Sequence, residues 1–185
     1  QQASVGLKIH VIAGVEISTV WNGHTVHVLG LDIDAQSAQL SHGLDSIRCS
    51  RGMRAQRIAA QLDAAGIEGS LQGAARHAGK SAAIGRSHFA RFLVEHKHAR
   101  NTSDAFTRYL GAGRLAYVSP CWPELRTSIS WIHSAGGQAV LAHPSRYRLA
   151  PHQLESLLEA YAQGGGDAIE ITGEGQIASP AQIRQ

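Results

Sequence analysis

The dipeptide Asn22-Gly23, set between two β-rich runs, is the feature of this sequence that most constrains its fold. Residues 14–21 and 24–31 are rich in the β-branched side chains that strands favour. Asn-Gly readily adopts the positive φ angles that a two-residue hairpin turn requires. The pattern therefore predicts an antiparallel hairpin whose register is set by the turn.

That register brings Glu16 and His27 to neighbouring positions on one face of the hairpin. If Trp21 faces His24, then Ser18 faces His27, and Glu16 shares a face with Ser18 because strand side chains alternate. Glu16 is then diagonal to His27, within roughly 8 Å. A carboxylate and an imidazole on one β surface can bind a metal ion or a small metal cluster together. The alternative for His27 is a structural role. Glu16, however, lies in a run apolar enough to be buried, where carboxylates are rare unless paired or metal-bound.

Length and composition indicate one globular domain with room for an inserted subdomain. The chain has 185 residues, of which 43% are hydrophobic. No apolar run is long enough to span a membrane, and the first residues lack the basic and apolar regions of a signal peptide. The two cysteines, Cys49 and Cys121, have no metal-site spacing, which favours a reducing, cytoplasmic setting.

Positive charge is concentrated in the middle of the chain. Residues 45–120 hold 12 Lys and Arg against 5 Asp and Glu, whereas the rest of the chain holds 5 against 9. Such a segment points to an anionic partner, such as a phosphate ester or nucleic acid, and a solvated helical surface is an equal alternative. The segment is also expected to be an insertion of short helices, at 46–65, 71–78, 87–95 and 103–110.

Helices and strands alternate after Pro120. Helical patterns at 123–135 and 151–163 end at glycines, and apolar strands follow at 138–142 and 167–171. Ser179-Pro180 is expected to begin another helix. This alternation predicts an α/β fold with a parallel sheet or barrel.

Two further positions are candidates for chemistry. His143 follows the strand 138–142, and sites of α/β proteins lie at the carboxyl ends of strands, which favours a ligand or acid–base role over an ordinary loop histidine. Pro144 also biases His143 to extended backbone. Arg86 precedes a helix that Ser87 is expected to cap, where free N–H groups and a guanidinium can bind phosphate; a plain capped helix start is the alternative.

Four motifs together resemble the polymerase and histidinol phosphatase (PHP) superfamily. They are residues 14–18, 27–31, 84–91 and 141–144, and the resemblance covers nearly the whole chain. The glutamate, the histidine eleven residues later and the Ala-His-Pro element are specific in combination. The branch that the chain resembles most is the bacterial one that dephosphorylates nucleoside 3′,5′-bisphosphates and trims short RNA from the 5′ end.

The resemblance implies part of a distorted (β/α)7 barrel, formed by residues 1–44 and 121–185, with the helical insertion 45–120 as a lid. We expect the basic face of this insertion to look onto the metal edge. Two or three divalent metal ions are implied, manganese first with zinc or iron as alternatives. The implied metal ligands are Glu16, His27 and His143, with His143 at the catalytic centre, and the implied phosphate contacts are Arg86 and His88.

The implied activity is hydrolysis of nucleotide phosphate esters by metal-activated water. Its substrates would be 3′,5′-bisphosphonucleotides or the 5′ ends of short RNA, and neither a membrane nor a protein partner is implied. The family's His-x-His and Asp-x-His strands are not present in the sequence. We therefore expect that the chain is part of a longer protein or that its metal site is incomplete, and that the chain alone has little activity. The alternative function is a non-catalytic nucleic-acid-binding or scaffold module of the same fold.

Overall fold

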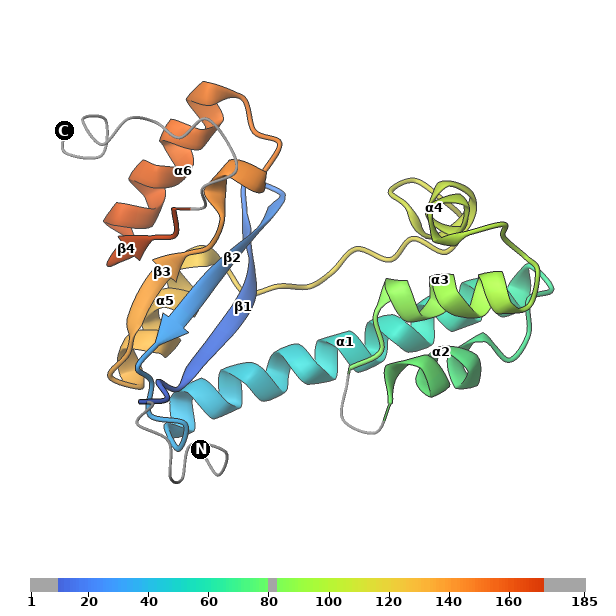
Figure 1. The fold of residues 1–185 in the computed structure, drawn as a ribbon, viewed down its shortest axis with the longest axis horizontal. Helices are drawn as coiled ribbons and strands as arrows, with labels where there is room; N and C mark the ends of the chain where they lie inside the picture. The colour runs from blue at the N-terminus through green and yellow to red at the C-terminus, as the bar shows by residue number, and fades with distance from the viewer. Residues whose placement is uncertain (1–9, 80–82, 172–185) are drawn as a thin grey trace. The chain divides into compact units, whose positions relative to one another are not determined.

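The computed structural model describes residues 10–79 and 83–171, which divide into two compact units (Figure 1). The first unit contains the chain up to Leu44 and again from Trp122 onward, and the second is Asp45–Cys121. The helix expected at Ser179-Pro180 lies outside the described residues.

A four-stranded sheet forms the first unit, in the order β1-β2-β3-β4. The strands are β1 (Gly14–Trp21), β2 (His24–Leu31), β3 (Gln138–Leu141) and β4 (Ala168–Ile169). β2 pairs antiparallel with both β1 and β3, and β3 pairs parallel with β4. The α/β class is confirmed, but the sheet is mixed rather than parallel, because the N-terminal hairpin supplies two antiparallel strands.

The hairpin has the predicted bounds and register. Asn22 (φ 44°) and Gly23 (φ 78°) take the positive φ angles of a tight turn, and Trp21 pairs with His24. The core face of the hairpin carries two cross-strand pairs, which are Ile17 with Val28 and Thr19 with Val26, and all four residues are buried. The opposite face carries Glu16, Ser18 and His27.

Two helices complete the first unit. α5 (Leu125–Ser134) packs on the sheet against β1, β2 and β3, burying Ile129 and Ile132. α6 (Pro151–Gln163), which has the predicted bounds, connects the parallel strands β3 and β4, and its Tyr161 hydroxyl bonds to carbonyls of both strand regions. The short 3₁₀ turn η3 (Pro144–Arg146) follows β3.

The second unit is helical around its own core. Its elements are the later part of α1 (Ala38–Ala64), α2 (Ser70–Ala78), α3 (Arg86–Glu95), α4 (Thr102–Ala105) and the π-helical turn η2 (Phe106–Leu110). Large buried side chains, led by Leu62, Phe89, Leu93 and Leu110, fill the core. Gly73 lets α2 approach α3 closely, because a Cβ atom there would lie 2.0 Å from the ring of Phe92.

The helix α1 begins eight residues before the predicted start at position 46. The hydroxyl of Ser37 accepts the N–H of Leu40, and the Ser37 carbonyl accepts that of Ser41, which is the pattern of a serine N-cap. The prediction missed this cap because the first turns lack a regular apolar stripe. The helix expected at 103–110 is divided into α4 and η2.

Candidate metal centre

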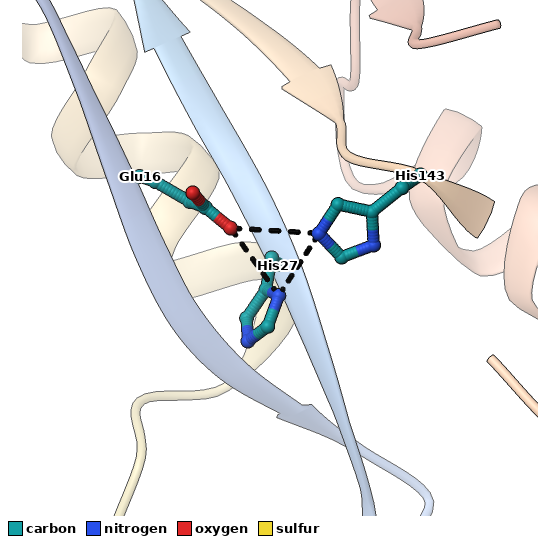
Figure 2. Close-up of side chains that lie close together, drawn as sticks. All are labelled: Glu16, His27 and His143. Carbon is teal, nitrogen blue, oxygen red and sulfur yellow. Dashed lines mark hydrogen bonds and ion pairs between the residues drawn. The ribbon is translucent and has the colours of Figure 1, made fainter. Parts of the chain in front are cut away.

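Glu16, His27 and His143 converge on one side of the sheet (Figure 2). The Oε1 atom of Glu16 lies 3.3 Å from His27 Nδ1 and 3.5 Å from His143 Nε2. The two imidazole nitrogens are themselves 3.3 Å apart. One ligand atom from each residue thus lies within 4.8 Å of the other two. The convergence expected from the sequence is present.

Strand register brings the three residues together. The hairpin makes Glu16 and His27 diagonal neighbours, as predicted. β3 then pairs with β2 so that Val28 faces Leu141, and the Ala142 N–H donates to the His27 carbonyl at 3.0 Å. His143, one residue further, therefore reaches the same place as His27.

The prediction that the Glu16 side chain is buried is wrong. Its side chain is 51% exposed, because Glu16 lies on the face of β1 opposite to the core residues. The side chains of His27 and His143 are 31% and 20% exposed. The cluster is thus open to solvent on the carboxylate side.

His143 has a left-handed backbone, with φ 34° and ψ 53°, so the extended geometry expected before Pro144 is also wrong. Non-glycine residues in this region cost about 1–3 kcal/mol and are found at functional sites when the surroundings hold them. Here the His143 N–H donates to Glu170 Oε2 at 2.9 Å. The Nδ1 atom of His143 is buried without a hydrogen-bond partner among the described residues, and Nε2 faces the cluster.

Tyr147 supports both histidines, and the sequence analysis missed it. Its hydroxyl accepts the His27 N–H at 2.7 Å and donates to the Ala142 carbonyl at 2.7 Å. Its ring stands edge-on to the imidazoles of His27 and His143, with centroids 6.4 and 5.5 Å away. Burial raises the pKa of the Tyr147 hydroxyl to about 12, which keeps the phenol neutral and able to donate. The only sequence signal for it is its position four residues after His143.

The donor set of the cluster fits a transition-metal cation. Two imidazole nitrogens and a carboxylate oxygen suit manganese, iron and zinc. Metal-binding sites also need groups that orient the ligands, and Glu170 and Tyr147 hold the backbone on which His143 and His27 lie. The residues present can therefore bind a divalent cation.

Arg86 and His88, the predicted phosphate contacts, lie in the second unit. Arg86 Nη1 donates to the Leu110 carbonyl at 3.3 Å, and its guanidinium lies 5.6 Å from the ring centroids of both Phe106 and Tyr117. Glu95, a carboxylate on the same helix, contacts His77 at 2.9 Å.

His88, not Ser87, caps the start of α3. The helix begins at Arg86 after the N-cap Gly85, whose N–H donates to the His88 Nδ1 at 3.1 Å. Burial, followed by the charges of Arg91 and His77, lowers the pKa of His88. A neutral imidazole whose Nδ1 accepts a hydrogen bond carries its proton on Nε2, so that atom remains a donor.

No helix in the described part of the chain is both long and apolar enough to cross a membrane. The fold and the cluster define the class of the protein: an α/β protein whose sheet carries a carboxylate–imidazole site of the metal-binding type.

Comparison with known proteins identifies the relatives of the chain. No family model matches it. It is 45% identical over 166 residues to the 5′-3′ exoribonuclease Rnm of Escherichia coli, and 42% identical over 158 residues to the 3′,5′-nucleoside bisphosphate phosphatase of Chromobacterium violaceum. These matches cover 90% and 85% of this chain but 56% and 55% of the relatives, so the chain spans about half the length of the curated relatives it matches.

Two solved structures resemble this chain. One is an amidohydrolase from Chromobacterium violaceum with bound sulfate and no metal, with 42% identity, a TM-score of 0.77 and coverage of 85% of this chain and 56% of that one. The other is a Bifidobacterium adolescentis protein assigned as a metal-dependent phosphoesterase, with 26% identity, a TM-score of 0.71 and coverage of 99% and 64%. The chain is similar to these bacterial proteins, and their names are consistent with the predicted resemblance to the PHP superfamily.

Proposed function

We propose that this chain is part of a metal-dependent phosphoesterase that hydrolyses nucleotide phosphate esters. Its substrates are 3′,5′-bisphosphonucleotides and the 5′ ends of short RNA. The observation that carries the proposal is the convergence of Glu16, His27 and His143 within 4.8 Å in a chain 42–45% identical to proteins named as a phosphatase and an exoribonuclease acting on such esters.

We assign the metal site to Glu16, His27 and His143, binding divalent cations, manganese first with zinc or iron as alternatives. When bound, the cations supply Lewis-acid activation of a water molecule and neutralise charge on the phosphoryl oxygens. Glu16, on the exposed face of β1, brings the negative charge that draws cations to the site. The bonds from Tyr147 and Glu170 to the backbones of the two histidines keep both rings aimed at one point.

Substrate binding is assigned to the basic segment 45–120. Arg86 is its first candidate for contact with phosphate, because its guanidinium has no carboxylate partner among the described residues and its planar fork matches phosphate oxygens. His88 is the second, through its Nε2 proton. We also propose that the sheet belongs to a distorted (β/α)7 barrel, supported by the parallel β3–α6–β4 connection, which is the repeating unit of such barrels.

Phosphate release from adenosine 3′,5′-bisphosphate by the intact protein tests the proposal. With Mn²⁺ present, Glu16→Gln and His27→Gln should lower kcat/KM by about 10²-fold or more, as expected when a metal ligand is lost. The matched control is His24→Gln, which removes an exposed histidine from the same strand outside the cluster.

Mn²⁺ binding, followed by electron paramagnetic resonance, separates the outcomes. Turnover that resists both variants and a chelator contradicts the proposal. Mn²⁺ binding that depends on Glu16 and His27 but comes with no hydrolysis of the bisphosphate or of short RNA identifies the non-catalytic module instead.

A further inference from the structure

Glu170 connects the ends of the two parallel strands β3 and β4. It follows β4, and its N–H donates at 2.9 Å to the carbonyl of Leu141, the last residue of β3. Its side chain reaches further along the same segment, where Oε2 accepts the His143 N–H at 2.9 Å. Glu170 therefore holds the chain on both sides of Ala142, at the point where β3 ends and the residue that carries one imidazole of the cluster follows.

The backbone of His143 needs a contact of this kind, because two local preferences oppose its conformation. The residue is left-handed, with φ 34° and ψ 53°, a region that residues with a Cβ atom adopt only occasionally. The next residue is Pro144, whose ring favours extended backbone at the position before it. A contact from outside the segment has to hold this conformation, and the hydrogen bond to Glu170 is such a contact.

The left-handed residue His143 also determines where Tyr147 lies. The His143 carbonyl accepts the Arg146 N–H at 2.9 Å, and the Pro144 carbonyl accepts that of Tyr147 at 3.3 Å, so the 3₁₀ turn η3 starts directly from His143. This turn leads the chain back to β2, where the Tyr147 hydroxyl accepts the N–H of His27 at 2.7 Å. A change in the backbone of His143 therefore moves Tyr147 and, through its hydroxyl, alters the contact with His27.

We propose that Glu170 is a positioning residue for both histidines of the cluster: for His143 directly, and for His27 through η3 and Tyr147. The inference rests on the proposed function only in taking the two histidines as metal ligands. It assigns to Glu170 an effect on His27, which lies on β2 and is separated from β4 by β3. Among the described residues, the ligand atoms that lie within 4.8 Å of one another do not include those of Glu170, so its role is to position ligands rather than to bind the ion.

Amide hydrogen exchange of the intact protein, measured with a chelator present, tests this coupling without any metal. Glu170→Met keeps the length of the side chain but removes the acceptor, and it should lower the protection of the His27 N–H about tenfold or more, although that N–H bonds to Tyr147. Glu170→Gln keeps an oxygen that can accept the His143 N–H, so protection should stay within about twofold of the wild type. The internal reference is the N–H of Val28, which pairs with Ile17 of β1 and should keep its protection in both variants.

Mn²⁺ affinity, followed by electron paramagnetic resonance, measures the consequence for the cluster. Glu170→Met should weaken Mn²⁺ binding about tenfold or more, as expected when a group that orients metal ligands is lost, whereas Glu170→Gln should bind within about threefold of the wild type. The matched control is Glu159→Met, which makes the same substitution at an exposed position on α6 and should change the affinity less than about twofold. Equal weakening by the Gln and Met variants of Glu170 would assign the effect to its charge and overturn the positioning role.

The wild-type protein keeps the inference testable if Glu170→Met does not fold. In the wild type the His143 N–H should be protected from exchange, and a freely exchanging His143 N–H overturns the proposal. In a folded Glu170→Met protein, equal loss of protection at His27 and Val28 also overturns it, because that result reflects general destabilisation. Loss of protection at His143 and His27 together, in a protein whose wild type binds no Mn²⁺, contradicts the proposed metal site but supports the positioning role, so the two failures are distinguishable.

Discussion

The hydroxyl of Tyr147 accepts the backbone N–H of His27 at 2.7 Å, joining residues 120 positions apart in the chain. The same hydroxyl donates to the Ala142 carbonyl at 2.7 Å. One phenol therefore connects strand β2, which carries His27, with the end of β3, which carries His143. The distance between the two imidazoles depends on this connection.

Tyr147→Phe should weaken Mn²⁺ binding about tenfold, a typical effect of losing a group that orients metal ligands. Phenylalanine keeps the ring but leaves the N–H of His27 without its acceptor, which should also cost about 1–3 kcal/mol of unfolding free energy. Metal affinity is measured by electron paramagnetic resonance and stability by urea unfolding. Tyr161→Phe is the control, because it removes a buried hydroxyl away from the cluster and should affect stability alone. Equal Mn²⁺ affinities in the two variants would show that Tyr147 has only a structural role.

Stability should fall at alkaline pH in part because of Tyr161. Its hydroxyl bonds to the carbonyls of Ala139 and Ala168, and burial raises its pKa to about 12 from the usual 10.0. Below pH 10 the phenol is protonated in both states, and its contribution is fully present. Between pH 10 and 12 the Tyr161 hydroxyl ionises in the unfolded state but stays protonated in the folded state. The free energy of unfolding therefore falls, by about 1 kcal/mol at pH 11. Urea unfolding at pH 7 and pH 11 should show a smaller loss in Tyr161→Phe than in the wild type.

At acid pH, the free energy of unfolding should depend on the contact between His133 and Asp167. The hydrogen bond from His133, then the one from the Ala139 N–H, lowers the pKa of Asp167 from 3.8. A lowered folded-state pKa gives stability that is present above pH 3.8 and lost as the pH falls through the folded value. Asp167→Asn should therefore destabilise the protein at pH 6 more than at pH 3 in urea unfolding. Asp63→Asn, at an exposed position on α1, should change the free energy of unfolding equally at pH 6 and pH 3.

Two glycine-to-alanine changes in helices should have opposite effects. Gly73→Ala should destabilise the second unit by about 1–3 kcal/mol, because the added methyl would overlap the ring of Phe92. Gly52→Ala, on α1 with no atom within 4 Å of its added Cβ, should stabilise by about 0.5–1 kcal/mol through helix propensity. Thermal unfolding of both variants checks the pair. A stabilised Gly73→Ala protein would mean that α2 and α3 can move apart at little cost.

Local sequence patterns were enough to predict the elements whose conformation depends on residues close together in the chain. Asn22-Gly23 determines the hairpin and its register, because a two-residue turn admits one alignment of its strands. From that register alone Glu16 and His27 could be placed together. The glycines after position 163 similarly mark the end of α6, where the predicted and observed bounds agree.

Only the tertiary structure could decide contacts between distant segments and the strain they impose. It set β3 antiparallel to β2, brought His143 to His27, and held His143 at a positive φ that the local preference before Pro144 opposes. It also brought Tyr147 to the N–H of His27, and Arg54 and Arg86 to the adjoining residues Val118 and Tyr117. Spacing along the chain carries no information on such pairs, because they depend on how separate strands and helices pack, and that packing is decided by burial summed over the whole core.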